Sequence, residues 1–195
     1  MKKQQRCNRC GKTVSPHDSI VFSLESTAGE ILCLKCANEE TAERMGIVFV
    51  HPEYAPIKVE DFDGIEHEFH FVTRLIDNIV SMDALELKAG KAHGYEFSVI
   101  GDDPEENTIE LYRKLVDRIR RSLAMRHLKE NDFGLQIDEP GIVRARISSD
   151  FNRGGLVPLL IIDGKEISWA EFGRMVLTYE GFQLKMEMFD RSEER

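Results

Sequence analysis

The sequence predicts an α+β protein in two parts, a small cysteine-containing finger and an α+β domain with a largely antiparallel sheet and two main helices. Three observations lead to this fold class. Four cysteines stand in two Cys-x-x-Cys pairs near the start of the chain. Apolar and polar residues alternate over 65–73 and 95–100, which is typical of half-buried strands. Residues 104–128 carry apolar side chains at helical spacing.

The two cysteine pairs are Cys7-Asn8-Arg9-Cys10 and Cys33-Leu34-Lys35-Cys36, and no other cysteine occurs. Pairs at this separation are a zinc signature, because two intervening residues let both sulfurs of a pair point at one ion. Cys7, Cys10, Cys33 and Cys36 are therefore expected to bind one structural Zn²⁺. Disulfides are the alternative, and they require an oxidising compartment that nothing in the chain marks.

The residues around the cysteines predict the rest of the finger. Segments 19–24 and 30–32 read as a β-hairpin, and 37–45 as a helix that Gly46 caps. This order resembles a four-cysteine treble-clef zinc finger over residues 7–46. Residues 7–12 and 31–36 also resemble the zinc-binding domain of ClpX-type unfoldases. That resemblance implies a module that dimerises and binds substrates and adaptors, without implying unfoldase activity.

A proline-containing stretch after the finger predicts the domain boundary. The expected parts are a finger over 1–46, a linker over 47–56 with a short strand at 47–50, an α+β domain over 57–190, and a frayed tail over 191–195. Strands over 65–73, 79–87 and 95–100, with a loop flanked by Gly90 and Gly94, predict an antiparallel meander. Residues 57–190 resemble an uncharacterised bacterial domain of unknown function, which implies no activity.

The helix predicted over 104–128 begins with a capping box at 103–106. Its apolar stripe is expected to be Ile109, Tyr112, Val116, Ile119 and Leu123. Its other faces are basic, and they carry Arg113, Lys114, Arg118, Arg120, Arg121 and Arg126. These cations fit two interpretations. They either pair with acidic residues of the same domain or are solvated, or they form a surface that binds nucleic acid.

The last third of the chain predicts further strands and one helix. Strands are expected at 135–137 and 142–147, followed by a buried central strand at 157–162 and a turn at Asp163-Gly164. Ser168 and Glu171 form a second capping box that opens a helix to about Tyr179. Alternation over 182–189 predicts a final strand.

Composition and motifs bound the function. The net charge of −9 argues against wholesale wrapping of nucleic acid. No signal-peptide pattern or membrane-spanning run is present, so a cytoplasmic location without membrane contact is expected. The expected role is an interaction or regulatory module that binds protein, and a homodimer stays open. The alternative is a nucleic-acid-associated factor using the finger and helix 104–128. An enzyme ranks third, with a site of scattered Asp, Glu and His residues around His67 or His93.

Overall fold

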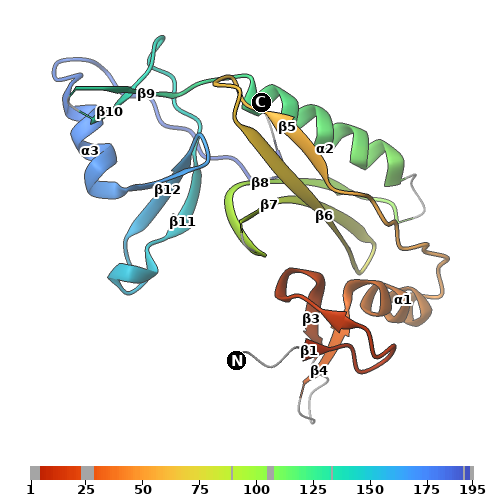
Figure 1. The fold of residues 1–195 in the computed structure, drawn as a ribbon. Helices are drawn as coiled ribbons and strands as arrows, with labels where there is room; N and C mark the ends of the chain where they lie inside the picture. Colours follow the sequence, from red (N-terminus) through yellow and green to blue (C-terminus); the bar gives the residue numbers. More distant parts are fainter. Residues whose placement is uncertain are drawn as a thin grey trace.

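The computed structural model describes residues 5–22, 29–88, 90–104, 108–132, 134–190 and 192–193. Helices and antiparallel sheets are combined as the α+β class predicts. Figure 1 shows the finger at one end, a central sheet, and a module formed by the last third of the chain. We call residues 127–190 the C-terminal module.

The described part of the finger contains two short β-pairs, one 3₁₀ turn and one α-helix. Its elements are β1 (Gln5–Arg6), β2 (Thr13–Val14), η1 (Pro16–Asp18), β3 (Ser19–Phe22), β4 (Glu30–Cys33) and α1 (Leu34–Met45). The predicted hairpin is the β3–β4 pair, and most of its turn lies outside the described residues. Gly46 ends α1 in a left-handed conformation with φ 69°, which glycine adopts without steric cost. The helix cap predicted at Gly46 is therefore confirmed.

The central sheet is an antiparallel meander in the order β5-β6-β7-β8, as predicted. Its strands are β5 (Ile57–Glu60), β6 (Glu66–Ile76), β7 (Ile79–Lys88) and β8 (Lys91–Gly101). The predicted loop at Gly94 is wrong, because β8 begins at Lys91 and Gly94 lies within it. Gly94 is needed there, since a Cβ would stand 2.2 Å from a carboxylate oxygen of Glu86.

Helix α2 (Thr108–Leu123) covers one face of this sheet. The predicted stripe is partly wrong, because Ile109 is 47% exposed while Leu111 and Leu115 are buried. The described part of α2 also ends before the predicted residue 128. The N–H groups of His127 and Leu128 donate to the Asp163 carboxylate at 2.9 and 2.8 Å, which takes them out of a helical pattern. The capping box at 103–106 lies partly outside the described residues.

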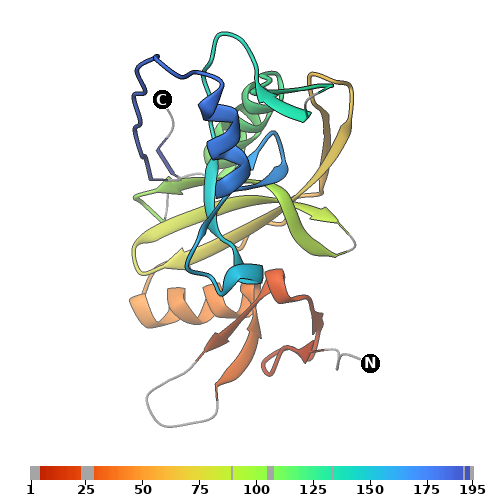
Figure 2. The same cartoon turned by 90° about the vertical axis from the view of Figure 1, so that its left-hand side faces the viewer.

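The finger lies on the opposite side of the sheet from α2 (Figure 2). Leu34 of α1 packs against Val72 and Leu85, and all three are buried. The predicted strand at 47–50 is wrong, because these residues form no ladder. Ile47 and Phe49 instead pack against the core beside α2. Contacts between the finger and the sheet thus continue along the chain after Gly46.

The C-terminal module has its own buried core. It contains β9 (Leu128–Asn131), β10 (Gly134–Ile137), β11 (Arg146–Ser149), η2 (Phe151–Arg153), β12 (Pro158–Ile162), β13 (Lys165–Ser168) and α3 (Trp169–Leu177). The sheet order β11-β12-β13 confirms a central strand near 157–162. The turn at Asp163-Gly164 joins β12 to β13. Ser168 caps α3 by accepting the N–H of Glu171 at 3.2 Å, as predicted.

Three predictions for the C-terminal module need correction. The strand expected at 142–147 begins only at Arg146, and β9 begins at Leu128, the residue at which the long helix is predicted to end. Residues 182–189 form no strand. Alternation suits a strand there, but a strand also needs a neighbouring backbone. No backbone hydrogen bond joins 183–188 to another part of the chain that the structure describes. Of the predicted frayed tail, only 192–193 are described.

Within the described ranges, none of the helices has both the length and the apolar content to cross a membrane.

Candidate metal centre

The first cysteine pair stands on a tight knuckle between β1 and β2. The N–H of Gly11 donates to the carbonyl of Cys7 at 2.9 Å, and the N–H of Cys7 donates to the carbonyl of Lys12 at 2.9 Å. Gly11 has a φ of 73°, which suits a glycine at such a reversal. These bonds turn the chain back on itself, so Cys7 and Cys10 present their sulfurs to one point.

The second pair stands where β4 passes into α1. Cys33 is the N-terminal capping residue of α1 and Cys36 lies in its first turn. The start of a helix favours negative charge in its vicinity. Asn8 joins the two halves, because its N–H donates to the carbonyl of Ile31 at 2.7 Å and its side-chain oxygen accepts the N–H of Ile31 at 3.0 Å.

The four sulfur atoms form one tight cluster. They all lie within 4.8 Å of one another, and the sulfurs of Cys10 and Cys33 are 3.8 Å apart. Four sulfurs bound tetrahedrally to Zn²⁺ at about 2.3 Å would stand roughly 3.8 Å apart. All four are free thiols, with Cys10 exposed and the other three buried. The cluster fits a metal ion, as the cysteine spacing predicts.

The electrostatics of the cluster also suit a bound cation. Burial alone would raise the pKa of Cys7, but N–H groups of Cys10, Cys33 and Arg9 outweigh it and lower that pKa to about 6. Burial raises the pKa of Cys33 and Cys36, and the neighbouring thiols raise that of Cys36 further. A cluster of protein groups alone therefore resists carrying four negative charges. A divalent cation would reduce this repulsion by binding all four as thiolates.

The basic residues predicted on α2 have several different environments. Arg113 pairs with Glu110 of the same helix at 2.7 Å. Arg118 donates to the carbonyl of Ser98 and to that of Ser192, the second at 3.1 Å. The remaining members on this helix are Lys114, Arg120 and Arg121, which are exposed. Part of the basic set thus serves contacts within the chain.

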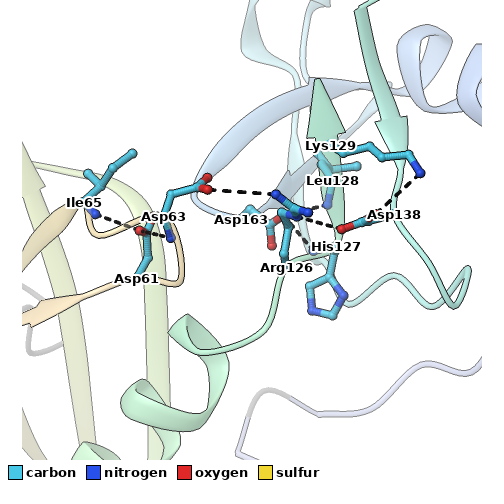
Figure 3. Close-up of polar contacts among 9 residues, drawn as sticks. All are labelled: Asp61, Asp63, Ile65, Arg126, His127, Leu128, Lys129, Asp138 and Asp163. Atoms are coloured by element: carbon cyan, nitrogen blue, oxygen red, sulfur yellow. Dashed lines mark hydrogen bonds and ion pairs between the residues drawn. The ribbon is translucent and has the colours of Figure 1, made fainter. Parts of the chain in front are cut away.

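Arg126 is not part of α2. It lies between the central sheet and the C-terminal module, where its Nε donates to Asp138 at 2.7 Å (Figure 3). Its guanidinium also lies 4.0 Å from a carboxylate oxygen of Asp63 and 4.8 Å from the centre of the Phe62 ring. Lys129 adds a second cation 3.6 Å from Asp138. Hydrogen bonding to Arg126 lowers the pKa of Asp138. Arg126 therefore joins two parts of the chain.

His67 stands between two carboxylates that sequence reasoning did not assign to it. Its Nδ1 lies 2.8 Å from Glu86 and its Nε2 lies 3.1 Å from Asp61. The Tyr95 ring meets the His67 ring edge to face at 5.3 Å. Burial, followed by the charge of Asp163, raises the pKa of Tyr95. Both ring nitrogens of His67 are thus engaged, and the neighbouring phenol holds its proton.

A small cavity of about 170 Å³ lies between β10 and α3. Its lining residues are Gly134, Leu135, Gln136, Glu171, Arg174 and Met175. Sites for small-molecule ligands are usually roughly 300–1,000 Å³, so this cavity is small for a substrate. Neither His67 nor His93 lines it. The carboxylates around His67 are therefore not part of this cavity.

Three family models match consecutive stretches of the chain. They are Domain of unknown function (DUF7685) over residues 6–48, Domain of unknown function (DUF7686) over 51–124, and Domain of unknown function (DUF7713) over 127–193. The first stretch holds the cysteine cluster, the second holds the central sheet with α2, and the third covers the whole C-terminal module. None of these matches links the finger to unfoldases. No curated protein and no solved structure matches the chain. Each part of the chain is thus similar to a domain whose description gives no function.

Proposed function

We propose that this chain is a cytoplasmic zinc protein that binds other proteins, and that its single Zn²⁺ is structural. The cluster of Cys7, Cys10, Cys33 and Cys36 carries this proposal, because its sulfurs lie within 4.8 Å of one another. Four thiolates complete the tetrahedral coordination of Zn²⁺ and leave no position for water or substrate. When bound, the ion would offset half of the charge of the four thiolates and hold the knuckle to the start of α1.

The finger is a treble clef in this proposal, since its order is knuckle, hairpin and helix. Its metal would support more than the finger itself. Helix α1 begins at the cysteines and carries Leu34, which packs on Val72 and Leu85 of the central sheet. Holding α1 in position therefore keeps this face of the sheet covered. The resemblance to ClpX-type zinc-binding domains supports a role in protein contacts.

The exposed apolar side chains favour a protein partner over nucleic acid. In β11 and the connections around it, Ile142, Ile147, Phe151 and Leu156 are 60%, 57%, 84% and 92% exposed. Aliphatic and aromatic side chains of this kind are typical of protein contacts. Nucleic acid would need basic side chains beside the finger. Arg118 and Arg126 instead make contacts within the chain, and the net charge is −9.

Site-specific photo-crosslinking tests the partner class. A photoreactive phenylalanine is placed at Phe151 in one variant and at Lys114 in another, and both are illuminated in cells of the native source. We expect an adduct at Phe151 that protease digests and nuclease leaves intact. Lys114 is the matched control on the basic face of α2. A nuclease-sensitive adduct at Lys114, with none at Phe151, would instead support the nucleic-acid interpretation.

A further inference from the structure

The segment 182–188 has the side-chain pattern of a strand but has no neighbouring strand among the residues that the structure describes. Phe182, Leu184, Met186 and Met188 alternate along it and are 77%, 68%, 49% and 66% exposed. Figure 2 shows the segment as an irregular trace beyond α3. In the part of the chain that the structure describes, residues 183–188 make no backbone hydrogen bond to another segment. Their N–H and C=O groups and their apolar face are available to a partner.

The charges of the segment are self-complementary. The Nζ atom of Lys185 lies 2.5 Å from a carboxylate oxygen of Glu187, and the two side chains are 81% and 52% exposed. Side chains two residues apart share one face of a strand, so both charges would lie on the face opposite the apolar residues. In an antiparallel pair of identical segments centred on Met186, Lys185 of each copy faces Glu187 of the other. Leu184 likewise faces Met188.

We propose that two copies of the chain associate through antiparallel pairing of this segment about a two-fold axis at Met186. The pairing gives two cross-strand ion pairs on one face and a continuous apolar row on the other, and each such pair stabilises an antiparallel ribbon. A two-fold contact uses the same patch on both partners and closes after two copies. The charges within the segment balance, so the contact adds no local repulsion to a protein with a net charge of −9.

This surface is separate from Phe151 and from the metal cluster, so the inference goes beyond the proposed function. A two-stranded ribbon by itself is only marginally stable in water, so its apolar face must pack against other apolar side chains. The segment starts beside α3, where the Phe182 ring meets the Tyr179 ring edge to face at 5.7 Å. Leu177 at the end of α3 is 68% exposed. Apolar side chains at this end of the C-terminal module can therefore pack against the apolar face of the ribbon.

Charge reversal and mixing test the register. Lys185→Glu places Glu opposite Glu187 of the second copy, and Glu187→Lys places Lys opposite Lys185. Like charges directly opposite destabilise a strand pair, so we expect either variant alone to raise the dimer dissociation constant by about tenfold or more. In an equimolar mixture of the two variants, both opposing pairs become complementary. The double variant Lys185→Glu/Glu187→Lys also restores complementarity.

The readout is sedimentation equilibrium of the full-length, zinc-loaded chain over a wide concentration range. We expect dimers for the parent chain, for the mixture and for the double variant, and weaker association for each single variant. Three results would overturn the proposal: a parent chain that stays monomeric, a single variant that dimerises as tightly as the parent, or a mixture that fails to associate. Zinc content serves as the control that each variant retains its finger.

Discussion

The finger and the C-terminal module each contact the central sheet, and the side chains at these two junctions differ in burial. The finger meets the sheet through buried groups, with Leu34 against Val72 and Leu85, and with Asn38, which is 2% exposed. The contacts between the C-terminal module and the sheet include two arginines. Arg126 and Arg146 keep 41% and 34% of their side chains exposed. The first junction is dry and the second is in contact with water.

At the dry junction, the side-chain amide of Asn38 hydrogen-bonds to the backbone of β6 as a neighbouring strand would. Asn38 donates to the carbonyl of Thr73 at 2.9 Å and accepts the N–H of Leu75 at 2.9 Å. These two groups belong to a stretch of β6 that β5 does not pair with. Asn38 thus satisfies backbone groups that α1 would otherwise bury without partners. Because unpaired buried groups cost more than exposed ones, mutations should act more strongly at the finger than at the C-terminal module.

Removal of a metal ligand should have the largest effect. Cys33→Ser is expected to lose the metal and unfold the finger, because structural zinc contributes on the order of 10–16 kcal/mol in finger peptides. Loss of α1 should also uncover Val72 and Leu85, which the finger buries. Elemental analysis measures the zinc, and amide hydrogen exchange measures protection of α1 and of β6 around residues 73–75.

The control for this variant is Val21→Ser, which changes a 69% exposed side chain in the same hairpin. It should keep one zinc per chain and normal exchange. Retention of full zinc and full α1 protection by Cys33→Ser would contradict the proposed structural role. Loss of zinc with unchanged exchange in β6 would mean that the finger and the sheet are energetically independent.

Asn38→Ala should have the next largest effect. It leaves the carbonyl of Thr73 and the N–H of Leu75 without their partner in a buried place. Each unsatisfied buried group costs roughly 1–3 kcal/mol, so the loss of partners for two groups should lower the free energy of unfolding by about 2–6 kcal/mol. Urea denaturation measures this change. Lys35→Ala, an exposed position on the same helix, should change it little, and an equal loss in both variants would refute the role of Asn38.

The sequence predicts features that depend on neighbours in the chain. The cysteine spacing indicated the metal cluster, Gly46 indicated the end of α1, and Ser168 indicated the start of α3. The two helix ends are each set by a few consecutive residues and their backbone chemistry. The metal cluster joins two cysteine pairs that are far apart in the chain, but each pair is a local motif that can be recognised by its spacing. The turn at Asp163-Gly164 is of the same kind. These predictions needed no knowledge of tertiary structure.

The features that sequence reasoning missed depend on residues far apart in the chain. Asn38 forms hydrogen bonds with Thr73 and Leu75, which lie 35 and 37 positions further along the chain. The sequence around Asn38 is that of an ordinary helix. The carboxylates of Asp61 and Glu86 reach His67 from a loop and from the next strand. Ile109 fits the helical period as well as Leu111, and only the position of the sheet decides which is buried. These choices are made by packing.

The dry junction should also respond to pH through His51. Its Nδ1 lies 2.8 Å from the amide nitrogen of Asn38, so the neutral ring accepts a hydrogen bond there. Burial lowers the pKa of His51 below its ordinary value of 6.5, although the charge of Asp18 opposes the shift. The unfolded chain therefore binds a proton more readily than the folded chain. Stability should be retained above about pH 7 and lost as pH falls through the lowered pKa.

His51→Gln tests this pH dependence, because glutamine can accept a hydrogen bond and does not titrate. The slope of unfolding free energy against pH between about 7 and 5 should become shallower in this variant. It should not vanish, because burial also lowers the pKa of His17. Urea denaturation at several pH values, with zinc content measured at each, gives the slope. Identical slopes for parent and variant would exclude His51 as a contributor.

The smallest effect is expected at the wet junction, for Arg146→Ala. One guanidinium nitrogen of Arg146 lies 3.4 Å from Glu96 and another donates to the carbonyl of Gly94 at 3.3 Å. Ion pairs with this much exposure contribute about 0.2–1 kcal/mol. The Nε atom of Arg146 is buried without a hydrogen-bond partner among the described residues, and its removal offsets part of that loss. The unfolding free energy should therefore fall by less than about 1 kcal/mol.

Glu96→Gln, which removes the charge but keeps the shape, is the matched variant. A loss as large as that of Asn38→Ala would mean that the wet junction contributes as much stability as the dry one.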